Sequence, residues 1–492
     1  MTAFTRQLTT RLPLTALCVT IVMVVSGCAS NRTVARPCIN DLSLGCDGHE
    51  EDIGAVAAAI PHSISRVELT DGDKPDKIAS AKSSTAPLTL TLVASHTSLN
   101  NPDIGIARAQ AFDTAAGVNI ASVPYTPKVE FTLTAGPEAT YNFESTIRTQ
   151  ETRKEATLRA SQLLFDFGKT GAEIDWAKAL NEAAIWREHA RTDEVLLEVV
   201  EAYLAVLEFD LQIANSLKNE HAHKELHRIM ALNEEAGNAT VADVQKALGR
   251  LENARTVTLN LRSDRQNSAS NFKRLTGLHP EALRKPKAVN SRLTSLQTSN
   301  IDTYAQKDAK LLSLKWDLVG LEAQKASLLR DYLPKLTLDA TAKVQENVTG
   351  TNPVQANGRV TVSLSGVIFD GGERKFKGEQ LDARIDEVRY RYRRATDQME
   401  QEIRDSARIL QTAKQKRASI ADRIKSGTEV VKLYIQQYEA GQRSMFEVLD
   451  AQQELFAAKS EQITGDFDVM RASYRAVKLN GHLVKTLVAQ AN

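Results

Sequence analysis

The chain has 492 residues, with 62 lysine and arginine residues against 61 aspartate and glutamate residues, so its formal net charge is +1. A nearly neutral chain with 25% charged residues does not favour nucleic acid as a partner, because nucleic-acid binding depends on a strongly basic surface. The sequence therefore predicts no nucleic-acid partner.

The N-terminus has the pattern of an export signal. Arg6 and Arg11 precede an apolar run from Leu14 to Val25, which is typical of a secretory signal and too short for a membrane span. The run ends in Val-Ser-Gly-Cys28, which resembles the bacterial lipobox, where the cysteine becomes the lipidated first residue. We expect residues 1–27 to be a signal peptide and Cys28 to carry lipid; the alternative is an ordinary signal peptide that happens to contain this cysteine.

The region after the signal is predicted to be a tether. Residues 28–87 are rich in Ser, Asp, Lys, Ala and Pro and show no sustained periodicity, which indicates poor order. Cys38 and Cys46 remain as an even pair in an oxidising compartment, where either a disulfide or two free thiols would fit. Ala29 stands where an aspartate would resemble an inner-membrane retention signal, so we expect an outer-membrane location.

The rest of the chain is an internal duplication. Glu235-Ala-Gly237 returns as Glu439-Ala-Gly441, which is 439 − 235 = 204 positions later, and Phe165-Asp-Phe-Gly168 returns as Phe369-Asp-Gly-Gly372 at the same offset. A repeat of this kind indicates that the fold consists of two similar halves. We expect a first repeat, a connection and a second repeat at residues 88–280, 281–300 and 301–492.

Each repeat is predicted to hold a helix, two strands, a very long helix and a shorter helix. Proline is absent from 138 to 279 and from 354 to 492, so long helices are permitted. A helix over 169–236 would be about 100 Å long, and Gly237 and Gly441 are expected to turn the chain back as hairpins. Alternation of Thr and Val with polar residues predicts three strands, and the repeat adds a fourth, at 128–135, 155–167, 335–342 and 358–365.

The sequence contains no complete motif for catalysis or metal binding. Gly168-Lys-Thr170 lacks the earlier glycine of a phosphate loop, since Leu163 stands there. His221, His223 and His227 share one helix, where a metal is conceivable and a solvent-facing cluster is preferred. No set of Ser, His and acid suggests a nucleophile. The sequence predicts no catalytic residue, no metal and no cofactor.

Four strands in an exported chain pose a physical problem. Strands in hydrocarbon must close into a barrel, because an open edge leaves backbone groups without hydrogen bonds. Bacterial barrels begin at about eight strands. One copy cannot close such a barrel, so two, three or four copies would be needed, with the long helices projecting into the periplasm as a tube.

The duplicated plan and several motifs resemble the TolC family of outer-membrane export channels over residues 88–490. The motifs are Phe-Asp-x-Gly before the long helix, Leu88-Thr-Leu90 with Asn101-Pro-Asp103, and Tyr438-Glu-Ala-Gly-Gln-Arg-Ser444 with Glu447-Val-Leu-Asp-Ala-Gln452. The resemblance implies a mainly α chain with a small transmembrane β part. It implies a homotrimer in the outer membrane, with a twelve-stranded barrel continuous with a helical tunnel in the periplasm.

The resemblance also implies partners and a gate. The partners are a periplasmic adaptor and an inner-membrane pump, either of the resistance-nodulation-division type or a type I secretion ATPase. Efflux and type I secretion both remain open, as does the substrate.

Tyr438 and Arg443 match the residues that hold the closed hairpins at the periplasmic aperture, and Asp243 matches their acidic partner. Glu447 and Asp450 match acids that line the constriction; they are three apart and share a helix face. An ordinary solvated face is the alternative for them.

A second function class is a non-conducting periplasmic coiled-coil adaptor or scaffold lipoprotein. An adaptor would normally show one hairpin flanked by many short strands, whereas this chain has two equal copies that each follow two strands. An enzyme is a third class, for which the sequence offers no site.

Overall fold

The computed structural model describes residues 87–141, 148–287, 289, 301–348 and 353–488, and these belong to one compact unit, Ser84–Asn492. The predicted signal peptide, most of the predicted tether, Cys28, Cys38 and Cys46 lie outside the described residues.

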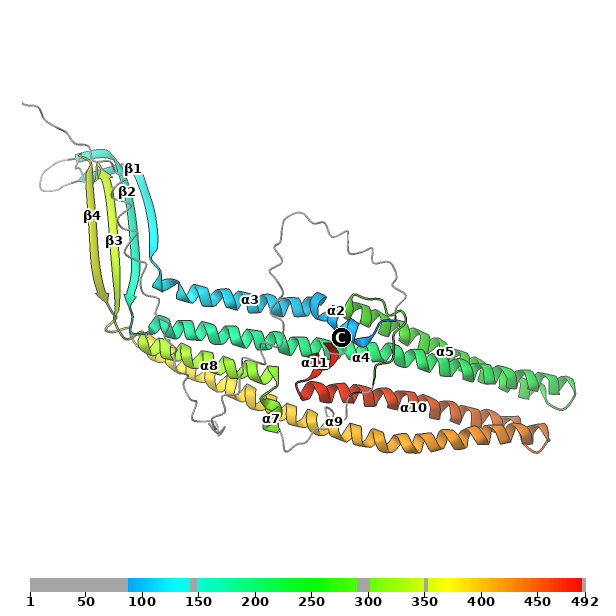
Figure 1. Ribbon diagram of the computed structural model, residues 1–492. Coiled ribbons are helices and arrows are strands. Elements are labelled where there is room, and N and C mark those ends of the chain that lie inside the picture. Colours follow the sequence, from blue (N-terminus) through cyan, green and yellow to red (C-terminus); the bar gives the residue numbers. More distant parts are fainter. Residues whose placement is uncertain (1–86, 142–147, 288, 290–300, 349–352, 489–492) are drawn as a thin grey trace, which may run out of the picture. The chain divides into compact units, whose positions relative to one another are not determined.

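The described residues form long helices and one four-stranded sheet (Figure 1). In chain order they are α2 (Leu90–Asn100), α3 (Pro102–Ser122), the 3-10 turn η2 (Val123–Tyr125), β1 (Lys128–Tyr141), β2 (Arg148–Phe165), α4 (Lys169–Glu235), α5 (Val241–Thr276), α7 (Ile301–Ala305), α8 (Ala309–Arg330), β3 (Lys335–Glu346), β4 (Gln355–Ser365), α9 (Glu373–Glu439), α10 (Met445–Leu479) and α11 (Leu483–Val488). Helices α4 and α9 have 67 residues each, about 100 Å. The prediction of a mainly α chain with four strands and two very long helices is confirmed.

The Phe-Asp-x-Gly motif starts each long helix. Asp166 accepts hydrogen bonds from the backbone N–H groups two and four residues ahead, at 3.0 and 2.7 Å. Asp370 does the same in the second repeat, at 3.0 and 3.2 Å. Gly168 and Gly372 have φ of 83° and 89°, a left-handed conformation that glycine adopts without strain. The motif is therefore a helix cap, used twice.

Helix α4 runs through the unit and packs against different partners along its length. It lies beside α3 and α8 in its first half and beside α5 and α10 in its second half, while α9 packs on α8 and α10 (Figure 1). The hydroxyl of Tyr203, midway along α4, donates to the backbone carbonyl of Leu88 at 2.8 Å. Around it lies the main apolar core, whose fully buried members include Leu196, Tyr203, Leu204, Phe272, Phe467 and Leu483.

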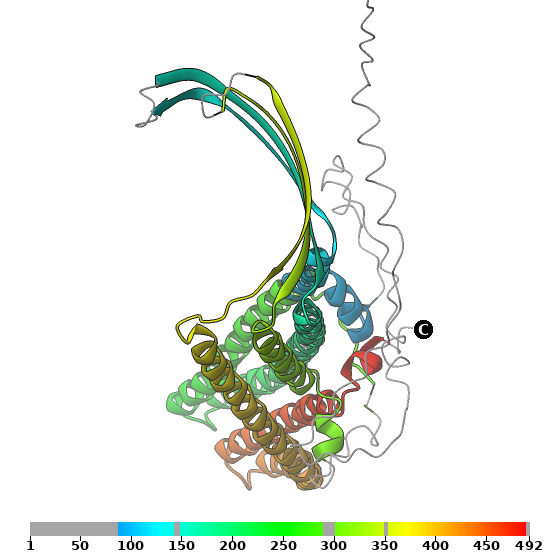
Figure 2. The same cartoon turned by 90° about the vertical axis from the view of Figure 1, so that its left-hand side faces the viewer.

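The strands form one antiparallel sheet in the order β1-β2-β3-β4, strongly curved in Figure 2. The strand β2, which the repeat predicted at 155–167, instead spans Arg148–Phe165, because residues before 155 pair with β1 through the backbone without apolar alternation. Among the described strands, β1 and β4 are the edges. No described helix has the length and apolar character that a membrane crossing requires.

Candidate functional site

The sheet has one apolar and one polar face, because its register aligns residues of one kind across all four strands. One row joins Val129, Ala160, Ala340 and Val360, and the next joins Glu130, Arg159, Thr341 and Arg359. The rows alternate in this way because successive side chains of a strand point to opposite faces. Phe131, in a further apolar row, is 66% exposed, so the described residues leave the apolar face uncovered.

Tyr438 joins the second hairpin to the first. Its hydroxyl accepts a hydrogen bond from the side-chain amide of Asn233, and it lies 3.7 Å from the sulfur of Met230. Both partners belong to α4. Tyr438 therefore contacts the first hairpin of the same chain through residues that the sequence did not single out, and its role in the gate stays a prediction.

Arg443 bonds within its own hairpin. Its guanidinium donates to Glu447 at 2.8 Å and to Gln437 at 2.7 Å, and it lies 3.7 Å from the ring centre of Tyr434. Within the described part of one protomer, Asp243 is bonded neither to Arg443 nor to Tyr438.

Asp243 instead caps the helix α5. It accepts hydrogen bonds from the backbone N–H and the hydroxyl of Thr240, at 3.1 and 2.8 Å, and these bonds lower the pKa of its carboxyl. Its predicted role as the acidic partner of the gate stays a prediction. Glu447 has the same capping position at the start of α10, with Ser444.

The two predicted constriction acids are exposed, and both are paired. Glu447 is held by Arg443 four residues before it, whereas Asp450 accepts from Arg250 of α5 at 3.0 Å. The sequence did not indicate Arg250, because the repeat offset aligns Asp450 with Lys246. The residue that contacts Asp450 is instead Arg250, one helical turn after Lys246 on α5. Lys246 lies over the ring of Phe446, at 3.9 Å from its centre.

An apolar cluster lies between the hairpin ends. It takes residues from both hairpins, and its buried members are Leu226, Met230, Ala247, Met445, Val448 and Leu449. Because burial of apolar surface is the main stabilising term in such contacts, this cluster holds the ends together, and the polar contacts lie around it.

The expectation of a solvent-facing histidine cluster is wrong for His223. This side chain is 1% exposed, and neither ring nitrogen has a hydrogen-bond partner among the described residues. It falls on the buried stripe of α4 with Leu226 and Met230, at three- and four-residue steps. Burial and the nearby Arg250 lower the pKa of His223. The described residues contain no group of three or more candidate metal ligands.

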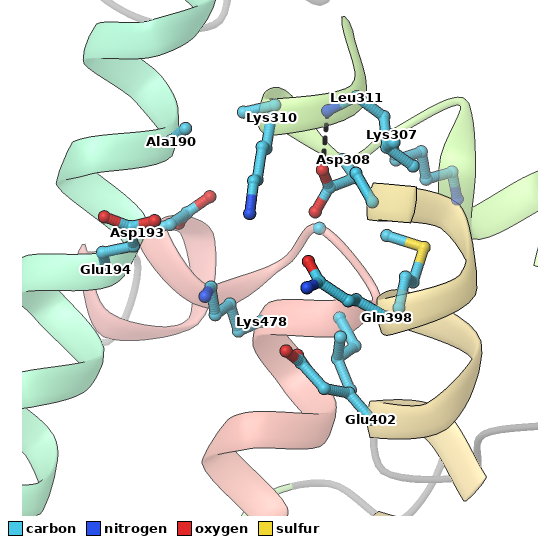
Figure 3. A pocket seen from close by; sticks show the side chains of 15 residues that line it. Ala190, Asp193, Glu194, Lys307, Asp308, Lys310, Leu311, Gln398, Glu402 and Lys478 are labelled. Atoms are coloured by element: carbon cyan, nitrogen blue, oxygen red, sulfur yellow. Dashed lines mark hydrogen bonds between the residues drawn. The ribbon is translucent and has the colours of Figure 1, made fainter. Parts of the chain in front are cut away.

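A small cavity of about 130 Å³ lies where α4, α8, α9 and α10 meet (Figure 3). Acidic and basic side chains line it together, including Asp193, Glu194, Lys310, Glu402 and Lys478. Burial raises the pKa of Asp193 to about 7; Lys478 opposes the shift, and Asp308 and Glu194 add to it. Ionised Asp193 is therefore a destabilising group near neutral pH.

Replacing Asp193 by asparagine is expected to stabilise the protein in a pH-dependent way. A carboxyl whose pKa is raised on folding keeps its proton in the folded state between about pH 4 and 7, so it lowers stability as pH rises through this window. The Asp193→Asn protein should be more stable by about 1–3 kcal/mol at about pH 8 and gain little at about pH 4. Thermal unfolding in detergent across this range measures the effect. Glu182→Gln, on the same helix but outside the cavity, is the control, and an equal difference at both ends of the range would contradict the prediction.

Two long hairpins joined to a sheet with one uncovered apolar face fit the class of outer-membrane export channels. The profile of the family described as outer membrane efflux protein matches residues 93–278 and 300–481, so the chain belongs to this family. The resemblance to TolC-type channels is confirmed.

Three relatives are similar over most of the chain. The outer membrane efflux protein BepC of Brucella suis biovar 1 is 24% identical over 398 residues, 78% of this chain and 83% of BepC. The outer membrane protein TolC of Escherichia coli K12 is 23% identical over 404 residues, 74% and 76% of the two chains. The alkaline protease secretion protein AprF of Pseudomonas aeruginosa is 23% identical over 333 residues, which cover 64% of this chain and 67% of AprF. By these descriptions BepC is an efflux protein and AprF is a secretion protein.

Solved structures share the fold. The outer-membrane channel OprN superposes with a TM-score of 0.71 at 19% identity, covering 80% of this chain and 90% of OprN. The CmeC outer membrane channel of Campylobacter jejuni superposes with a TM-score of 0.72 at 16% identity, covering 82% of this chain and 88% of CmeC.

Proposed function

We propose that this outer-membrane export channel works as a homotrimer whose sheets close one barrel and whose hairpins form a periplasmic tunnel. The observation that carries the proposal is the sheet, whose edges β1 and β4 pair with no other described strand and whose apolar face is exposed. Backbone groups at a free edge cannot stay unpaired in hydrocarbon. Pairing β4 of one copy with β1 of the next gives 3 × 4 = 12 strands in a closed ring.

Exposed apolar side chains on the helices support assembly. Ile106, Phe112 and Ile120 of α3 are exposed, as are Phe376 and Tyr390 of α9. Exposed apolar surface of this extent marks contact sites. In the trimer these side chains would meet neighbouring protomers, which explains why one chain leaves them uncovered.

The tunnel would end at the hairpin tips, where the gate residues lie. The polar face of the sheet would line the barrel, since strands of such barrels alternate apolar-out and polar-in. Tyr438 and Arg443 would hold the closed hairpins, with Asp243 of a neighbouring protomer as a partner, and Glu447 and Asp450 would face the lumen. Three copies would place 3 × 2 = 6 carboxylates around the aperture.

The channel would work with a periplasmic adaptor and an inner-membrane pump, either of the resistance-nodulation-division type or a type I secretion ATPase. BepC is described as an efflux protein and AprF as a protease secretion protein, so the relatives support both kinds of export system. A non-conducting adaptor or scaffold is not favoured by these similarities.

Three features remain proposals from the sequence. They are a signal peptide at 1–27 with lipid on Cys28, a disulfide between Cys38 and Cys46, and the division into repeats at 88–280 and 301–492. The intact mass of the mature protein would decide the first two, because lipid and a disulfide each change it.

Reconstitution into planar bilayers tests the channel. We expect purified trimers to form cation-preferring pores, and Glu447→Ala with Asp450→Ala to lower the cation preference by about two- to tenfold, because acidic rings favour cations. Glu461→Ala with Asp466→Ala is the matched control, since these acids pair with Arg423 and Arg417 of α9. A stable monomer without conductance would refute the channel, and an unchanged preference would refute the placement of the two acids.

A further inference from the structure

We propose that Arg250 is a specificity-determining residue of the aperture: it keeps the charge of Asp450 compensated while the two hairpins of a protomer are in contact. This inference rests on the proposed function, because it requires Asp450 to face the lumen of a trimeric channel. It predicts that cation preference depends on whether the hairpins are together or apart.

The contact between Arg250 and Asp450 runs in register with a second polar contact between α5 and α10. Arg250 donates to Asp450 at 3.0 Å. Lys246, one turn earlier on α5, lies 3.9 Å from the ring centre of Phe446, one turn earlier on α10. Residues four apart share a helix face, so the two helices present matching faces. Separation of the hairpins would break both contacts together.

The two constriction acids differ in where their partners lie. Arg443, the partner of Glu447, is in the same hairpin, four residues away at 2.8 Å, so this pair survives any movement of the hairpin as a body. Asp450 pairs only with Arg250 among the described residues, and that partner belongs to the other hairpin. Moving the hairpins apart therefore releases one carboxylate per protomer, three per channel.

The exposure of the pair indicates an electrostatic role. The side chain of Arg250 is 42% exposed and that of Asp450 is more exposed still. Ion pairs exposed to this degree contribute little to stability, because solvent screens them and ordering their long side chains costs entropy. Packing of the hairpins depends on the apolar cluster beneath, which includes Val448 and Leu449. A neutral residue at position 250 should therefore leave folding intact and change the charge at the aperture.

The first test is Arg250→Gln in planar bilayers, with reversal potential and conductance as readouts. The variant should raise the cation-to-anion permeability ratio by about two- to fivefold, because three counter-charges leave the aperture. Conductance should stay close to that of the parent, because the apolar cluster still packs the two hairpins together. The matched control is Arg255→Gln on the same helix, where the arginine is 44% exposed and pairs with Glu220 and Glu252 of its own hairpin. The control should match the parent.

The second test reverses the pair, with Arg250→Asp and Asp450→Arg in one protein. A counter-charge again compensates the carboxylate, so the permeability ratio should return toward the parent value. An Arg250→Gln channel with the permeability ratio of the parent would overturn the inference while leaving the channel function standing. If both altered proteins failed to insert while Arg255→Gln inserted, Arg250 would be an assembly residue and the inference would also fall. A parent that forms no pores would refute the channel function itself.

Discussion

Phe131→Arg is expected to prevent insertion of the protein into the outer membrane. Phe131 lies on the edge strand β1, opposite Leu158, in a row that continues with Ala342 on β3. An arginine on the lipid-facing side of a barrel costs about 2–4 kcal/mol at the bilayer centre and less toward the interfaces. Three copies of the change would be present in one trimer, so the cost repeats around the barrel. Assembled trimer in the outer-membrane fraction should fall to about a tenth of the parent or less.

Two further changes separate charge from other effects of the substitution. Thr132→Arg adds the same side chain one residue later, on the polar face, where Thr132 pairs with Thr157. Phe131→Leu keeps the apolar face and removes only the ring. Both proteins should insert. If Phe131→Arg inserted as well as Thr132→Arg, the apolar face would not be in contact with lipid, and the barrel arrangement would have to be abandoned.

The helices and hairpin turns were predictable because a few residues decide them. Absence of proline permits α4 and α9, and Gly237 and Gly441, with φ of 75° and 69°, end them at the predicted places. The extent of β2 was not predictable, since residues 148–154 carry no apolar alternation. They pair with β1 through backbone hydrogen bonds, to which any sequence of suitable conformation contributes.

Within the candidate site, only contacts between residues close in the sequence were predictable. Thr240-Val-Ala-Asp243 and Ser444-Met-Phe-Glu447 have the spacing of capping boxes, so the capping roles of both acids were visible in the sequence. The contact between Arg250 and Asp450 was not, because it joins residues 200 positions apart and depends on how α5 and α10 are rotated about their axes. The burial of His223 likewise follows from which face of α4 meets its neighbours.

Arg374→Met is expected to cause the largest loss of stability among helix-start changes. The side chain of Arg374 is 6% exposed, and its guanidinium lies 2.8 Å from the carboxylate of Asp370 and donates to the backbone carbonyl of Asp331 at 2.8 Å. It also lies 4.4 Å from the ring centre of Tyr332. One side chain thus ties the start of α9 to the turn that follows α8. Methionine would fill the space but leave the carboxylate of Asp370 without its cation.

The physical cause can be isolated by neutralising both partners. Removing one partner of a sheltered pair leaves an uncompensated charge, whereas replacing both removes that penalty. We expect Arg374→Met to lower the thermal midpoint by about 5 °C or more, and Arg374→Met with Asp370→Asn to recover part of the loss, because asparagine can still cap α9. Thermal unfolding of detergent-solubilised protein measures both. Thr170→Ala, at the matching position of the first repeat, controls for general sensitivity of the helix starts. A doubly altered protein no more stable than Arg374→Met would show that Arg374 acts through its backbone contacts rather than through the charge of Asp370.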